Sequence, residues 1–131
     1  MSGAIGSIQL KKFPKFLYQR QKNSEKFLAK MQSFKDIIVQ KEIGRSSWFG
    51  FSLVINKESN LKRKNLIKIL NKLGFECRPI VAGNFAKNEV TKYFDSEISD
   101  DLENADYIDK NGLFIGNHHL DMRDAINSID I

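Results

Sequence analysis

The sequence predicts an α+β fold, in which a small sheet is covered by helices and preceded by a long helix. Strict alternation of apolar residues over 48–56 indicates a strand with one buried face. Apolar residues at helical spacing follow over 61–73, and a short apolar segment begins after Gly74. Strand, helix and strand in this order make a compact unit in which the helix covers one face of the sheet.

Length and composition set the class of protein. The 131 residues are enough for one hydrophobic core and too few for two, so we expect one globular unit. No apolar run reaches the roughly 18 residues of a membrane span. The first ten residues do not resemble a signal peptide, and the single cysteine, Cys77, permits no intramolecular disulfide. Together these features predict a cytoplasmic protein.

Positive charge is concentrated near the start of the chain. Residues 1–45 hold ten lysines and arginines against three acidic residues, within a net charge of +5 for the whole chain. Such a basic segment is one signature of a module that binds RNA or another polyanion. Lysines spaced every three to five residues are also typical of the solvated face of a helix, and we favour that interpretation.

Two helices are predicted at the start. Residues 3–12 form the first, which we expect to be interrupted before Pro14. Residues 15–34 form a long amphipathic helix, with Arg20 among the basic residues away from its apolar stripe. Residues 37–39 fit either a short strand or a last helical turn.

The central strand and helix have defined faces and ends. In the strand we expect one face to carry Phe49, Phe51, Leu53 and Ile55, and the other to carry Trp48, Gly50, Ser52 and Val54. Ser59 or Asn60 is the expected cap of the helix at 61–73, and Gly74 is the expected left-handed residue after it.

The remaining elements are shorter. We predict a short helix at 88–94 and a second at 101–110, whose first turn pairs Asp100 with Glu103 in a variant capping box. A buried strand at 113–116 and a closing helix at 121–131 complete the chain.

Four polar residues are candidate binding groups. Arg78 and Asn84 lie in the loop after the second strand, and a guanidinium offers a fork of donors suited to phosphate or carboxylate. His118 and His119 follow the strand at 113–116; if they extend that strand, they point to opposite sides of it. Their spacing to other ligand types does not support a metal site. Asn84 also fits a plain turn role, Arg78 a surface ion pair and Cys77 a small inert core residue.

Several segments resemble one family. They are 76–85 (Glu-Cys-Arg-Pro-Ile-Val-Ala-Gly-Asn-Phe), 112–119 (Gly-Leu-Phe-Ile-Gly-Asn-His-His), 4–12 and 48–55. In this order they resemble the C-terminal domain of the sugar-nucleotide aminotransferases and 3-dehydratases, which are DegT-type pyridoxal-phosphate enzymes of fold type I. The sequences of these segments are most similar to the lipopolysaccharide branch of the family, which acts on a CDP-4-keto-6-deoxyhexose.

The resemblance implies a divided protein. It makes 1–34 an interdomain helical segment and 35–131 a small C-terminal domain with a mainly antiparallel sheet. It implies a nucleotide-sugar substrate that contacts Arg78, Asn84, His118 and His119. Pyridoxal phosphate is expected in the full-length homodimeric family, held by a large domain or a split-gene partner. No cofactor-binding or catalytic motif occurs in 1–131, so we expect no bound cofactor and no turnover by this chain by itself. From composition we expect no membrane contact, and nucleic acid is a disfavoured partner.

Three hypotheses follow. The first is a C-terminal fragment of a pyridoxal-phosphate-dependent sugar-nucleotide 3-dehydratase or aminotransferase of lipopolysaccharide O-antigen deoxysugar biosynthesis. It predicts exposed apolar and small residues around 3–12 and near the 78–85 loop. The second is a basic RNA-binding or polyanion-binding module, whose affinity would fall steeply with salt. The third is a truncated relic that folds and has no biochemical role.

Overall fold

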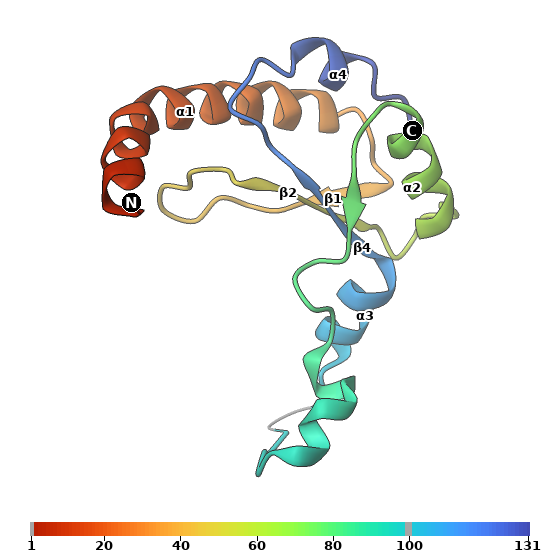
Figure 1. Ribbon diagram of the computed structural model, residues 1–131. Helices are drawn as coiled ribbons and strands as arrows, with labels where there is room; N and C mark the ends of the chain where they lie inside the picture. Colours follow the sequence, from red (N-terminus) through yellow and green to blue (C-terminus); the bar gives the residue numbers. More distant parts are fainter. Residues whose placement is uncertain (1, 99–100) are drawn as a thin grey trace.

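The computed structural model describes residues 2–98 and 101–131. The protein consists of a sheet, helices along one side of the sheet and an arm that extends away from the sheet (Figure 1). The α-helices are α1 (Ser2–Met31), α2 (Arg63–Lys72), α3 (Glu103–Asn111) and α4 (Arg123–Asn127), and the arm contains two 3₁₀ helices, η1 (Phe85–Lys87) and η2 (Glu89–Tyr93). The strands are β1 (Ile37–Val39), β2 (Gly50–Ile55), β3 (Cys77–Arg78) and β4 (Gly112–Gly116).

The four strands form one antiparallel sheet in the order β1-β2-β4-β3. Residues 37–39 are therefore a strand, which decides between the two interpretations of that segment. β2 and β4 are the central pair, with Phe51 opposite Ile115 and Leu53 opposite Leu113. The expectation of a small, mainly antiparallel sheet in an α+β fold is confirmed.

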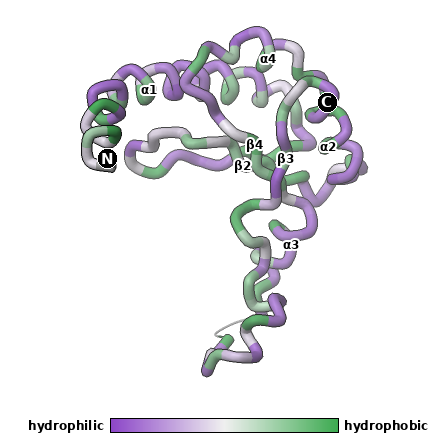
Figure 2. Tube along the Cα trace, in the orientation of Figure 1, coloured by the Kyte–Doolittle hydropathy of each residue, from purple (hydrophilic) through white to green (hydrophobic). Residues whose placement is uncertain are grey.

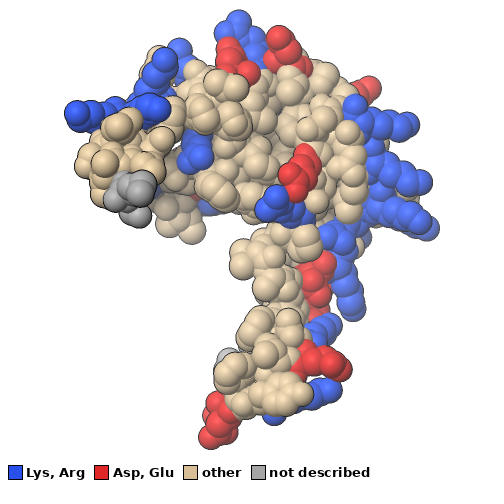
Figure 3. Space-filling model, viewed as in Figure 1, with Lys and Arg blue, Asp and Glu red and all other residues tan. Residues whose placement is uncertain are grey.

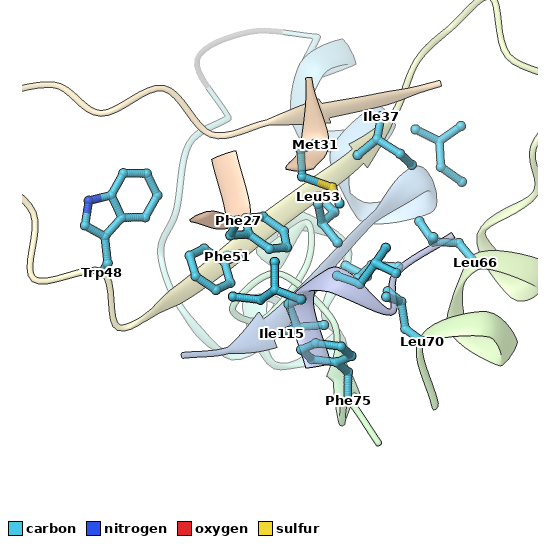
Figure 4. Packing of buried hydrophobic residues seen from close by; sticks show 14 residues of the cluster. Phe27, Met31, Ile37, Trp48, Phe51, Leu53, Leu66, Leu70, Phe75 and Ile115 are labelled. Carbon is cyan, nitrogen blue, oxygen red and sulfur yellow. The ribbon is translucent and has the colours of Figure 1, made fainter. Parts of the chain in front are cut away.

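The hydrophobic core lies between one face of the sheet and the helices α1, α2 and α4 (Figures 1 and 4). The central strands contribute Phe51, Leu53, Ile55, Leu113 and Ile115, and the helices contribute Phe27, Met31, Leu66, Leu70 and Ile126, all of them buried. The rings of Phe27 and Phe51 stack with centroids 4.0 Å apart, which joins the second half of α1 to the centre of the sheet. Burying these side chains supplies the main favourable contribution to folding.

The predicted interruption before Pro14 is wrong, because α1 continues through this residue. Proline removes one backbone donor and crowds the preceding turn, which bends a helix without necessarily ending it. Figure 1 shows such a bend in the first half of α1, which turns away from the line of the second half. The helix also ends at Met31, short of the predicted residue 34.

The predicted faces of β2 are wrong at its start. Trp48 is buried and Phe49 is 68% exposed, the reverse of the expectation. Trp48 has a φ of 49°, in the left-handed region, so the chain turns there and regular pairing begins at Gly50. The turn directs the indole into the core and leaves the Phe49 ring on the open side of the sheet, near Phe114.

The helix after β2 begins later than predicted, at Arg63, with Lys62 as its N-cap residue. Ser59 is not that cap because its hydroxyl accepts a hydrogen bond from the Leu61 N–H in the preceding turn. At the other end Gly74 has a φ of 84°, as predicted for a glycine after a helix.

The arm comprises residues 79–98 and runs away from the sheet, next to α3 (Figure 1). A short helix was predicted at 88–94; the 3₁₀ helix η2 (Glu89–Tyr93) lies there, and a second one, η1 (Phe85–Lys87), precedes it. The side chains of Asn84 and Asn88 each accept a backbone N–H and act as the N-caps of η1 and η2, so a new short helix begins after each of them. Asp100 of the predicted capping box lies outside the described residues; Leu102 is the N-cap of α3, and Asp101 accepts the Glu103 N–H.

The closing helix is shorter than the predicted 121–131, because α4 spans Arg123–Asn127. The Asp121 carboxylate accepts a hydrogen bond from the Arg123 N–H, and the helix therefore begins at Arg123, two residues after the predicted start. The chain then ends in a turn in which the Ile129 N–H donates to the Ile126 carbonyl. Both isoleucines are buried, as the apolar pattern predicted.

Candidate functional site

A groove of 470 Å³ lies where α1 crosses the end of the sheet. Its walls come from α1, the start of β2, the turn between α2 and β3, and the end of β4. The lining residues are Arg20, Phe49, Gly74, Phe75, Glu76, Arg78, Phe114, Gly116, Asn117, His118 and Met122. Three aromatic rings and two guanidinium groups thus share one concave surface, a composition that suits a flat ligand carrying negative charge.

Two of the four predicted site residues, Arg78 and His118, lie in this groove. The Arg78 guanidinium pairs with Glu76, with 2.7 Å from Nη2 to Oε1, and its Nε donates to the same oxygen over 2.9 Å. Both side chains are exposed, so this ion pair contributes little to stability. An exposed pair can exchange partners at low cost, which keeps Arg78 available to a ligand.

His118 and His119 do not point to opposite sides as predicted, because they follow the end of β4 in a turn. Their rings stack with centroids 4.3 Å apart, and His119 also packs against Phe16 of α1 at 4.1 Å. The His118 Nδ1 accepts the Leu120 N–H. Partial burial, followed by the neighbouring His118 and Arg20, lowers the pKa of His119. The lowered pKa favours the uncharged form of the imidazole that packs against the helix.

Asn84 does not reach the groove. It is buried at the base of the arm, where its amide donates to the Asp106 carboxylate of α3 and its oxygen accepts the Ala86 N–H. Lys87 pairs with the same carboxylate, and these two hydrogen-bonded partners lower the pKa of Asp106. These contacts are those of a turn residue that fastens the arm to α3; a role in substrate binding stays a prediction.

Sequence reasoning missed Arg20, which it placed on the solvated side of the helix. The side chain is half-buried, and its guanidinium carbon lies 5.5 Å from the centre of the Phe49 ring. The Arg20 Nε is buried and has no hydrogen-bond partner among the described residues. The signal was present in the sequence: Arg20 stands three and seven residues before Asn23 and Phe27, on the face of α1 that packs on the sheet.

Asn23 and Asn117 hold this end of the groove together. The Asn23 side-chain amide lies within hydrogen-bonding distance of the Asn117 side-chain oxygen (3.1 Å) and of the backbone oxygens of His118 (3.0 Å) and Leu120 (2.9 Å). The Asn117 amide donates to the backbone oxygens of Arg20 and Trp48. Both asparagines are buried. The pair ties α1 to the turn that carries His118, and so fixes two walls of the groove relative to each other.

Two further kinds of reactive side chain are the single thiol and the residues that could hold a metal ion. Partial burial raises the pKa of the Cys77 thiol, which disfavours the reactive thiolate. The residues that the structure describes bring together no group of three or more histidine, cysteine, aspartate or glutamate side chains suited to a metal ion. Within 2–98 and 101–131, no helix combines the length and apolar character that crossing a bilayer requires.

The fold and groove define a small α+β domain with a concave surface of aromatic and cationic side chains. The family model of the DegT/DnrJ/EryC1/StrS aminotransferase family matches residues 1–129, and the chain belongs to this family.

Curated relatives give the comparison more detail. The chain is 54% identical over 128 residues to a GDP-4-keto-6-deoxy-D-mannose 3-dehydratase of Escherichia coli O55:H7, covering 97% of this chain and 33% of that protein. It is 28% identical over 119 residues to the lipopolysaccharide biosynthesis protein RfbH of Salmonella typhimurium, covering 88% of this chain and 27% of that protein. The chain thus spans about a third of the length of the curated relatives it matches.

A solved structure agrees with the fold. The E. coli GDP-4-keto-6-deoxy-D-mannose-3-dehydratase with bound hydrated PLP superposes with a TM-score of 0.92 at 54% identity, covering 97% of this chain and 33% of that one. The match identifies the fold as that of the C-terminal part of pyridoxal-phosphate aminotransferases. Full-length members of the family use this cofactor.

The groove was tested as a site for pyridoxal phosphate. That cofactor needs a cradle for its phosphate, a partner for its pyridinium nitrogen and a positioned base. The groove lining contains no lysine among the described residues, and its one carboxylate, Glu76, is paired with Arg78. The described groove residues therefore offer no free carboxylate for the pyridinium nitrogen and no lysine, so by itself the groove does not fit this cofactor despite its two arginines, and no catalytic step is derived from it.

Proposed function

We propose that this chain acts as the small domain of a pyridoxal-phosphate-dependent nucleotide-sugar 3-dehydratase or aminotransferase of lipopolysaccharide deoxysugar biosynthesis. It supplies one wall of the substrate cleft, and turnover requires a large domain that holds the cofactor, in a dimer like that expected for the family. Residues 1–34 are the interdomain segment and 35–131 the small domain. The names of the relatives favour a GDP-linked sugar as the substrate over the CDP-linked sugar that the sequence motifs suggested.

The observation that carries this proposal is apolar surface that the chain does not cover itself. In the first half of α1, Ile5, Ile8 and Leu10 are exposed, with Leu10 at 72%. In the arm, Val81 is 94% and Tyr93 85% exposed. The expectation of exposed apolar residues around 3–12 and near the 78–85 loop is confirmed.

The arrangement of this surface favours a large partner. Figure 2 shows hydrophobic stretches along the arm and in the first turns of α1, outside the body of the domain. Figure 3 shows that much of the arm's visible surface is uncharged. Exposed apolar surface of this kind is typical of contact with another protein surface. A large domain that covered these residues would remove them from water.

Reconstitution tests the proposal. The chain is mixed with the remaining two-thirds of the E. coli 3-dehydratase, produced as a separate polypeptide, in the presence of pyridoxal phosphate. We expect a stable complex that retains the cofactor's visible absorbance and consumes GDP-4-keto-6-deoxy-D-mannose, while the chain by itself does neither. Stoichiometric cofactor binding or sugar conversion by the isolated chain would contradict the proposal.

One observation favours polyanion binding as a second candidate. Lys64, Lys68 and Lys72 follow one another at four-residue spacing along α2, a helix without any acidic residue. Figure 3 shows basic side chains gathered over this helix. Like charges at this spacing destabilise a helix slightly, and a bound polyanion would relieve them. Retention on a heparin column at two ionic strengths separates the candidates: steep loss with salt supports polyanion binding, and weak retention at both argues against it.

A further inference from the structure

We propose that Arg20 is the anchor for a phosphate group in the groove, so that the groove takes a phosphorylated ligand such as a nucleoside diphosphate. This inference rests on the proposed function and deepens it, because it names a residue that holds the phosphates of the substrate.

The charges of the groove leave Arg20 without compensation. The ionisable side chains in the lining are Arg20, Glu76, Arg78 and His118. Glu76 forms an ion pair with Arg78, with 2.7 Å from the Glu76 Oε1 to the Arg78 Nη2. Arg20 makes no ion pair within the described part of the chain, although it is half-buried. A charge that is partly removed from water is costly unless an opposite charge meets it, and a bound anion would do so.

The Arg20 side chain also has a buried donor, Nε, without a partner among the described residues, whereas buried donors in proteins are nearly always paired. The guanidinium lies over the Phe49 ring, and such stacking restricts its plane. The terminal nitrogens of a guanidinium form a fork that matches two oxygens of a phosphate.

The backbone beneath Arg20 is held in place before any ligand arrives. The Asn117 amide donates to the Arg20 carbonyl oxygen over 2.9 Å, and Asn23, one turn later, is fixed by the turn that carries His118. A binding group on a fixed backbone loses less conformational entropy when the ligand binds. Arg78 also lines the groove, but its charge is already compensated by Glu76 and its side chain is exposed, so it gains less than Arg20 from a bound anion.

The test measures binding of small phosphates to the whole 131-residue chain by calorimetry. GDP, inorganic pyrophosphate and guanosine are titrated into the parent chain and into Arg20→Met, Arg20→Lys and Arg45→Met. Arg45 is the matched control, because it is exposed and does not line this groove. Thermal unfolding of each variant, followed by the fluorescence of Trp48, verifies that it is folded.

We expect GDP and pyrophosphate to bind and guanosine not to bind. Arg20→Met should weaken both phosphate ligands about tenfold or more, since a tenfold change corresponds to about 1.4 kcal/mol. Arg20→Lys should recover part of the loss, and Arg45→Met should stay within about twofold of the parent. Equal binding by folded Arg20→Met, or no binding of either phosphate, overturns the inference.

The two proposals fail separately. If the reconstituted complex turns over and Arg20→Met leaves its KM unchanged, the phosphate anchor is wrong and the proposed function stands. If the complex fails to form while pyrophosphate binding still depends on Arg20, the site is real and the proposed function is wrong. Binding of pyrophosphate as tightly as GDP would identify a site for free phosphate and contradict a nucleotide site.

Discussion

Replacing Asn23 with alanine tests the clamp between α1 and the turn after β4. The Asn23 oxygen accepts from the Gln19 side chain and the Met122 N–H, and its amide is shared among three oxygens. An amide carries two hydrogens, so it satisfies two of those three at any moment. Alanine therefore removes about four hydrogen bonds, each worth about 1 kcal/mol net, and leaves the buried Asn117 oxygen without its donor. We expect a loss of about 3–5 kcal/mol.

Urea unfolding followed by the fluorescence of the single tryptophan, Trp48, measures this loss. Because a domain of this size has a total stability of about 5–15 kcal/mol, the variant should unfold at clearly lower urea concentration. Asn65→Ala is the matched control: Asn65 is an exposed helical residue of α2, and its replacement should change stability by no more than about 0.7 kcal/mol. A loss below about 1 kcal/mol for Asn23→Ala would refute the clamp.

Other predictions concern pH, packing and the core. The pKa of His119 in the folded state lies below its ordinary value of 6.5, so the folded state binds fewer protons than the unfolded state. The free energy of unfolding should therefore fall as the pH drops below 6.5. His119→Phe should abolish this fall when unfolding is measured between about pH 7 and 5. Gly50→Ala should cost about 1–3 kcal/mol because the methyl group would overlap the Phe114 ring, whereas Gly116→Ala, with open space around it, should cost less in the same urea assay. Leu70→Ala, at a fully buried site, should cost about 2–5 kcal/mol.

Local pattern was sufficient for the elements of the core. Alternation over 51–55 and helical spacing over 66–73 each follow from one buried face, so the sequence carries the signal within a few residues. Gly74 could be read as a left-handed residue for the same reason, since the conformation favours glycine wherever it occurs. These elements were predicted correctly, apart from the exact ends of the helix.

The errors lie where distant parts of the chain decide the conformation. At Trp48 the chain turns and buries the indole. The Asn117 side-chain amide, 69 positions away in the sequence, donates a hydrogen bond to the Trp48 carbonyl and holds this turn. The bend at Pro14 persists as helix because that half of α1 is exposed and has room to bend. Neither effect has a signature in a short window of sequence.

The groove shows the same limit in its function. His118 was found because its loop follows a strand, and binding groups concentrate in such loops. Arg78 was predicted in a loop of the same kind but is the last residue of the strand β3. Arg20 was assigned to solvent because, like the lysines of the predicted helix, it lies away from the apolar stripe. Its actual surroundings come from Asn117, which lies 97 positions away and pins the same turn of helix to the sheet. A basic residue on a helix becomes a binding group when a second element covers it, and here that element is the turn after β4.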